Sequence, residues 1–170
     1  NTMVTDVVRQ IVRGRTAALD LGCGNFRDSR WLKRQGFVRV VAVDPADVKG
    51  YLHDGIEFNQ MRIEDFPIPE GAYDFIAACS VFHYLHVDNI VALVPSIMRG
   101  LRSGGVFSFN VLGERDGWIQ DGLERACFTS ESFTRLIAPY RSLCEAKELE
   151  LTLGKKWHMF YAVLSNPEPA

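Results

Sequence analysis

Residues 17–25 read AALDLGCGN, an apolar run that ends in an acid and a Gly-x-Gly turn. A second apolar run, residues 38–43, ends in another acid, Asp44. Because Gly22 and Gly24 carry no side chain, backbone N–H groups in the turn can approach a ligand closely, and the next helix points its positive end there. An acid at the tip of the second strand is placed to accept hydrogen bonds from ribose hydroxyls. The two segments together predict a nucleoside cofactor bound on an open α/β sheet.

The same signature also suits a dinucleotide-binding fold, and a third small residue distinguishes the two. A dinucleotide turn requires G-x-G-x-x-G/A, since the third small residue permits close packing of helix and strand. Arg27 stands at that position. A pyrophosphate-binding turn is therefore disfavoured, and so is a nicotinamide-dependent oxidoreductase.

Two further stretches add to this pattern. Residues 20–25, DLGCGN, with the strand-ending Asp44, resemble motifs I and II of class I S-adenosylmethionine-dependent methyltransferases. Residues 83–86, HYLH, and 101–105, LRSGG, are similar to the H-x-L…R-x-L-x-P-G-G stretch of small methyltransferases. The resemblance spans nearly all of residues 15–165. Within the superfamily, the sequence is similar to the tellurite-resistance type of methyltransferase.

Length and composition limit the other possibilities. The 170 residues are 47% hydrophobic and 24% charged, which suits one globular domain over residues 1–165 and a disordered tail at 166–170. The net charge of −2 provides no broad basic field, so no nucleic-acid partner is expected. The apolar runs are too short to span a membrane and no signal peptide is visible, so we expect no membrane partner. Four cysteines without CxxC spacing suit free thiols in the cytoplasm.

Alternating apolar and amphipathic segments predict a mostly parallel sheet. Strands are predicted at residues 16–21, 38–43, 57–61, 73–79 and 106–110, and helices at 4–13, 26–35, 88–101 and 129–138. The third of these helices is predicted to begin with Asp88 as its N-cap. Residues 141–152 and 156–164 read as a closing antiparallel hairpin that turns at 154–155. The resemblance implies an α/β, Rossmann-like, seven-stranded sheet of order 3-2-1-4-5-7-6, its last strand pair antiparallel, with helices on both faces.

The resemblance implies that S-adenosyl-L-methionine lies across the loops that follow the first four strands. The expected cofactor-binding residues are Asp20, Gly22, Cys23, Gly24, Asn25, Asp44, Pro45, Ile63, Glu64, Asp65, Cys79 and Ser80. The first loop wraps the methionine part, and Asp44 accepts the ribose hydroxyls. Many family members carry an acid where Arg62 stands. Adenine is therefore expected to meet the backbone of Ile63 and one of the two carboxylates that follow it.

For catalysis, the sequence favours a methyltransferase that acts on a small-molecule nucleophile. A sulfonium methyl is already electrophilic, so positioning alone can support direct in-line transfer, without a covalent intermediate. His83 and Tyr84 are the expected catalytic residues, needed only where the acceptor must lose a proton. Cys79, His83 and His86 have no nearby fourth ligand at a typical spacing, so no metal is expected. Residues 114–118 form a charged loop that either borders the acceptor site or is simply solvated.

A second hypothesis is a cofactor-binding module that has no catalysis of its own and is completed by a partner chain. It rests on the short segment between the second and third predicted strands, and on the few residues that precede the first strand and leave the substrate side without a cap. In either case a monomer or a homodimer is expected.

Overall fold

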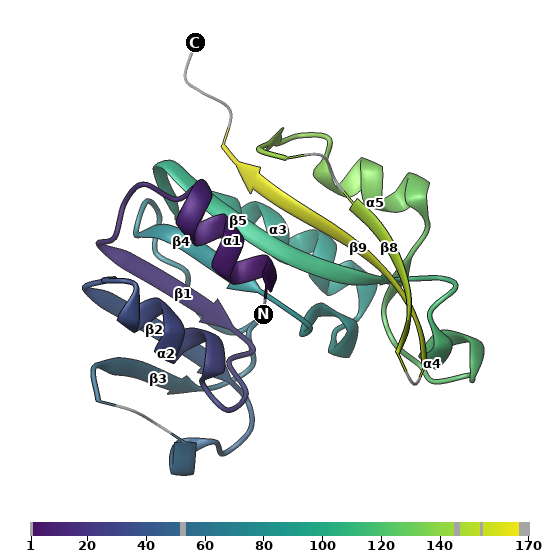
Figure 1. Cartoon of the computed structure of the whole chain (residues 1–170), viewed down its shortest axis with the longest axis horizontal. Helices are drawn as coiled ribbons and strands as arrows, with labels where there is room; N and C mark the ends of the chain where they lie inside the picture. The colour runs from purple at the N-terminus through teal and green to yellow at the C-terminus, as the bar shows by residue number, and fades with distance from the viewer. Residues whose placement is uncertain (1, 52–53, 145–146, 154, 167–170) are drawn as a thin grey trace.

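The computed structural model describes residues 2–51, 54–144, 147–153 and 155–166, and one sheet organises them (Figure 1). The strands of the described residues follow the order β3-β2-β1-β4-β5-β9-β7, with β6 paired to β5 and β8 to β9. Their bounds are β1 Ala17–Leu21, β2 Arg39–Asp44, β3 Ile56–Gln60, β4 Tyr73–Ala78, β5 Leu101–Gly113, β6 Cys127–Phe128, β7 Arg141–Ser142, β8 Lys147–Leu153 and β9 Lys155–Ser165.

The topology confirms the expected fold class. Strands β1 to β5 are mutually parallel, whereas β9 runs antiparallel to β5 and both β7 and β8 run antiparallel to β9. The strand count differs because the predicted strand 141–152 is divided into β7 and β8, and because β6 adds a short parallel pair at the end of β5. The predicted hairpin turn involves Gly154, which lies outside the described residues.

The fifth strand is longer than predicted. Gly104 and Gly105 were expected to separate a helix from a strand at 106–110, yet β5 already begins at Leu101. Its register against β4 shifts between Tyr73 and Phe75, which accommodates the glycines as an irregularity inside the strand. At the other end, buried Val111 and Leu112 continue the apolar run, so the strand extends to Gly113.

Helices cover both faces of the sheet, as predicted (Figure 1). Their bounds are α1 Thr2–Gln10, α2 Arg27–Arg34, α3 Val87–Gly100, α4 Gly117–Gln120 and α5 Ser130–Ile137, with single 3₁₀ turns η1 at Lys49–Tyr51 and η2 at Phe82–Tyr84. Alternate residues of each strand point to opposite faces. One set packs with α1 and α2 in front of the sheet, and the other packs with α3 and α5 on the opposite face.

Two chain segments differ locally from the sequence prediction. Helix α3 is capped by His86 and not by Asp88, because the His86 Nδ1 accepts the backbone N–H of Asp88 at 3.3 Å. In the predicted tail, the Asn166 side-chain amide donates to the carbonyl of Met98 at 2.9 Å, and residues 167–170 lie outside the described residues. Within the described part of the chain, no helix is both long and apolar enough to cross a membrane.

Candidate functional site

The glycine turn after β1 is held tightly from two sides. Gly22 has φ +74° and Gly24 has φ +50°, left-handed conformations that favour glycine. The N–H of Gly22 donates to the carbonyl of Val43 at 2.8 Å, which joins the turn to β2. A Cβ on Gly22 would collide with the side chain of Val81, whereas a Cβ on Gly24 would meet no atom within 4 Å. The backbone at Gly24 therefore borders open space, as a ligand cradle requires.

Asp44 ends β2 beside this turn and fixes it. Its Oδ2 accepts the N–H of Gly24 at 2.9 Å, and its Oδ1 accepts the N–H of Ala46 at 2.9 Å. Each carboxylate oxygen has a second lone pair that can still accept a hydrogen bond. The side chain is therefore oriented by the backbone and retains acceptor capacity toward a ligand.

A cavity of about 480 Å³ opens at this point, at the carboxyl ends of the first four strands. Its lining residues are Gly22, Gly24, Asp44, Pro45, Arg62, Ile63, Glu64, Ser80, Val81, Tyr84 and Leu85. The volume lies within the range of small-molecule and cofactor sites. An open backbone cradle, an oriented carboxylate and an apolar wall are what the polar ribose and the flat adenine of S-adenosylmethionine require, so the residues present suit this cofactor.

Five of the predicted cofactor residues are not among those that line the cavity: Asp20, Cys23, Asn25, Asp65 and Cys79. Asp20 is buried beneath the glycine turn and accepts a hydrogen bond from the Ser29 hydroxyl of α2. Burial raises the pKa of Asp20 to about 7. Burial also raises the pKa of the Cys23 thiol, which keeps it protonated. Asp20 and Cys23 are thus buried at the turn and do not line the cavity.

Ser80 lines the cavity and has a strained backbone conformation. Its φ is +57°, which is uncommon for a residue with a side chain. Its N–H donates to Asn110 Oδ1 at 2.7 Å, and Asn110 is buried on β5. Backbone strain of this kind gathers at ligand sites, where surrounding contacts hold it. Asn110 was missed from the sequence, although a polar residue inside the apolar run 106–112 is the signal that marks it.

The two predicted catalytic residues lie on η2, at the edge of the cavity. Tyr84 is 62% exposed and lines the cavity, whereas His83 is 5% exposed and does not. Their rings lie 4.3 Å apart, and the His83 ring also meets Trp118 at 5.6 Å. Trp118 follows β5, so the charged loop 114–118 reaches this side of the site. Sequence alone left that loop undecided between a rim and a solvated turn.

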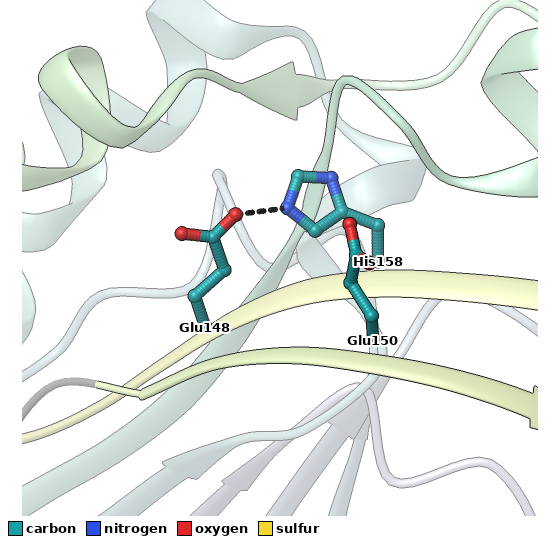
Figure 2. A group of neighbouring side chains, drawn as sticks. All are labelled: Glu148, Glu150 and His158. Carbon is teal, nitrogen blue, oxygen red and sulfur yellow. Dashed lines mark hydrogen bonds and ion pairs between the residues drawn. The ribbon is translucent and has the colours of Figure 1, made fainter.

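A separate group of side chains, Glu148, Glu150 and His158, places possible metal ligands within 4.8 Å of one another (Figure 2). The His158 Nδ1 accepts the backbone N–H of Arg115 at 3.0 Å, so the ring proton lies on Nε2 and is donated to Glu148 at 2.8 Å. The Arg115 guanidinium pairs with both carboxylates. A metal on Nε2 would have to displace this proton, so the group is better described as a tether between the loop after β5 and the β8–β9 hairpin.

Comparisons with known proteins identify the class. A family model described as a methyltransferase domain matches residues 19–109, more than half of the chain, so the chain belongs to this family. No curated protein matches the sequence. This confirms the expectation that the chain is a methyltransferase and that it has the fold of the S-adenosylmethionine-dependent methyltransferases.

Solved structures share this fold at low sequence identity. TehB from Haemophilus influenzae has a TM-score of 0.79 and 20% identity, over 98% of this chain and 62% of its own. The Burkholderia thailandensis 1,6-didemethyltoxoflavin-N1-methyltransferase, solved with 1,6-didemethyltoxoflavin and S-adenosylhomocysteine, has a TM-score of 0.75 and 19% identity, over 99% and 78%. The chain bound to the Trm112 methyltransferase activator of Haloferax volcanii has a TM-score of 0.76 and 15% identity, over 99% and 90%.

Proposed function

We propose that the chain binds S-adenosylmethionine in the cavity at the glycine turn and transfers its methyl group directly to a small-molecule nucleophile. The observation that carries this proposal is the joint position of Gly24 and Asp44, where an open backbone and an oriented carboxylate face one cavity. Residues 1–165 would form this single catalytic domain. A cytoplasmic location and a monomeric or homodimeric state remain predictions.

The cavity walls assign roles to the residues that face a bound cofactor. Asp44 would accept the ribose hydroxyls, since its position and remaining lone pairs suit them. Ile63 and Glu64 also line the cavity and would meet the adenine. Glu64 is held by Arg62 Nη2. Asp65 does not line the cavity, so the structure favours Glu64 as the carboxylate that takes the adenine amino group.

The chemistry requires little more than alignment. S-adenosylmethionine, when bound, supplies an electrophilic sulfonium methyl. Holding an acceptor in line with it can contribute as much as about 7–11 kcal/mol, which removes the need for a nucleophilic enzyme residue. Tyr84 lines the cofactor cavity and its ring touches that of His83, so these two residues are the nearest candidates to remove a proton. A thiolate acceptor would need no base.

Release of S-adenosylhomocysteine tests this function. The purified chain would be incubated with S-adenosylmethionine and a panel of thiols, amines and phenols, with acceptor-free reactions as the control. We expect acceptor-dependent release for at least one chemical class. Cofactor binding without release in any reaction would contradict independent catalysis.

The second candidate is a cofactor-binding module completed by a partner chain. One structural neighbour is bound to the Trm112 activator, which shows that this fold can work beside a second protein. Under this alternative, the chain alone binds S-adenosylmethionine, but acceptor methylation begins only when a partner is added to the same panel.

A further inference from the structure

A second cavity, of about 500 Å³, lies beside the cofactor cavity. Its lining residues are His83, Tyr84, Leu85, His86, Val87, Glu124, Arg125 and Ala126. Tyr84 and Leu85 also line the cofactor cavity, so the two hollows share a wall. The N–H of Ala126 donates to the carbonyl of His83 at 3.3 Å, which fixes the segment before β6 against η2.

Arg125 supplies the positive charge of this hollow, whose lining also includes Glu124. Its guanidinium lies over the Tyr84 ring, 5.1 Å from the ring centroid, and its Nη1 donates to the backbone carbonyl of Glu124 at 3.0 Å. Its Nε is shielded from solvent and has no hydrogen-bond partner within the described part of the chain. Among the residues that the structure describes, no carboxylate forms an ion pair with Arg125, and Glu124 meets it through the backbone alone.

An arginine without an ion-pair partner is suited to bind an anion. A buried donor without an acceptor costs free energy, so the side chain gains from any small turn that gives Nε a partner. With Nη1 engaged, the edge formed by Nε and Nη2 is the one that such a turn would bring to the hollow. That edge matches the two oxygens of a planar carboxylate, which arginine binds through two parallel hydrogen bonds.

We propose that this second hollow is the methyl-acceptor site and that Arg125 binds a carboxylate on the acceptor. The inference rests on the proposed function, because it places the acceptor next to the bound cofactor, where Tyr84 and Leu85 border both hollows. The rings of Tyr84 and His83 add an aromatic surface, so the site suits a flat acid. The substrate class is thus a small aromatic carboxylate that bears the nucleophilic atom.

Benzoate and benzamide provide a matched pair of probes for the carboxylate. Both would be titrated by saturation-transfer NMR into the full chain saturated with S-adenosylhomocysteine. We expect benzoate to bind about ten- to a hundred-fold more tightly than benzamide, since both partners of the hydrogen-bonded pair are then charged and not the arginine alone. The preference should disappear in Arg125→Met and be reduced in Arg125→Lys, which keeps the charge and loses the planar edge.

Arg135→Met is the control, because Arg135 lies on α5 and pairs with Glu131 at the surface. It should keep the wild-type preference, and circular dichroism should show that all variants are folded. Equal binding of the two probes, binding of neither, or an undiminished preference in Arg125→Met would overturn the inference. Calorimetry with S-adenosylhomocysteine on the same samples tests the proposed function separately, because cofactor binding without a benzoate preference refutes only the acceptor site.

Discussion

At the scale of single residues, Asp44 has two duties, since it orients the glycine turn and faces the proposed ribose position. Replacing it by alanine removes the acceptor for the Gly24 N–H as well as the ribose contact. We expect Asp44→Ala to weaken S-adenosylhomocysteine binding by about 1.5–3 kcal/mol, the range for hydrogen bonds to a charged group. Isothermal titration calorimetry measures this change.

Asp47→Ala is the matched control for that substitution. Asp47 is an exposed acid in the same loop and accepts a long hydrogen bond, 3.4 Å, from the Lys49 N–H. Its replacement should leave the affinity unchanged. An unchanged affinity in Asp44→Ala would remove Asp44 from the cofactor site.

Asp20 predicts a pH dependence of stability. Burial raises its pKa from 3.8 to about 7, so the folded chain binds more protons than the unfolded chain between these values. The stabilising contribution is therefore complete below the lower value and is lost as the pH rises through the upper one. An amide side chain cannot ionise, so Asp20→Asn should gain thermal stability relative to wild type as the pH rises from about 5 to about 8.

Melting temperatures of the two proteins across this range test the assignment. Asp74→Asn serves as a comparison. In the wild type, the Asp74 carboxylate accepts the backbone N–H groups of Thr16 and Ala17. This variant should lose stability at neutral pH instead of gaining it. A constant difference in melting temperature between Asp20→Asn and wild type would show that Asp20 does not titrate in this range.

At the scale of elements, the turn after β1 and the segment before η2 pack against each other through Gly22 and Val81. A methyl group on Gly22 would meet the Val81 side chain and would also strain a backbone at φ +74°. We expect Gly22→Ala to lower both stability and cofactor affinity. Adding Val81→Ala should recover part of the loss, because it removes the collision and leaves the strain.

The double-mutant cycle has a coupling energy of about 0.5–3 kcal/mol if the two residues touch as described. Gly24→Ala is the control, since its backbone is also left-handed but its Cβ would meet nothing. Additive effects of Gly22→Ala and Val81→Ala in denaturant unfolding would contradict this packing.

The tether between the loop after β5 and the hairpin depends on buried His158 more than on surface charges. Replacing His158 by leucine leaves the Arg115 N–H without its acceptor, which should cost about 1–3 kcal/mol of unfolding free energy. Arg115→Met removes only solvent-exposed ion pairs and should cost much less unfolding free energy than the histidine substitution. Equal losses in urea unfolding, or a zinc-induced rise in melting temperature, would contradict the tether.

Local patterns made many elements predictable. The strand before Gly22, the strand ending at Asp44 and the periodic helix α3 all follow from residues close in sequence. The extension of β5 could not be predicted, because two adjacent glycines such as Gly104 and Gly105 usually mark the end of a helix or strand. Only the register against β4 shows that the strand runs through them. The His86 cap likewise depends on a ring orientation that sequence does not specify.

The residues of the candidate site likewise include some that the local sequence predicts and some that it does not. Gly22, Gly24 and Asp44 carry their roles in the local pattern, and all three border the cavity. Asp20 belongs to the same motif, yet its side chain points to Ser29 because the strand alternates. Arg125 gave no signal, since its position beside Tyr84 arises only when the segment before β6 packs on η2.

At the scale of the whole molecule, one edge of the sheet carries both proposed ligand sites. The cofactor cavity lies at the ends of the first four strands, and the second hollow lies between η2 and the segment before β6. Tyr84 and Leu85 line both hollows, so the proposed donor and acceptor sites are immediate neighbours. This arrangement depends on the nucleoside cofactor binding in the first cavity.

Calorimetric titration of the chain with S-adenosylhomocysteine, and in parallel with NADH, tests that claim most directly. We expect saturable binding of one S-adenosylhomocysteine per chain and no binding of NADH, because Arg27 stands where a dinucleotide turn needs a small residue. Absence of saturable heat with S-adenosylhomocysteine, or binding of NADH in its place, would contradict the account.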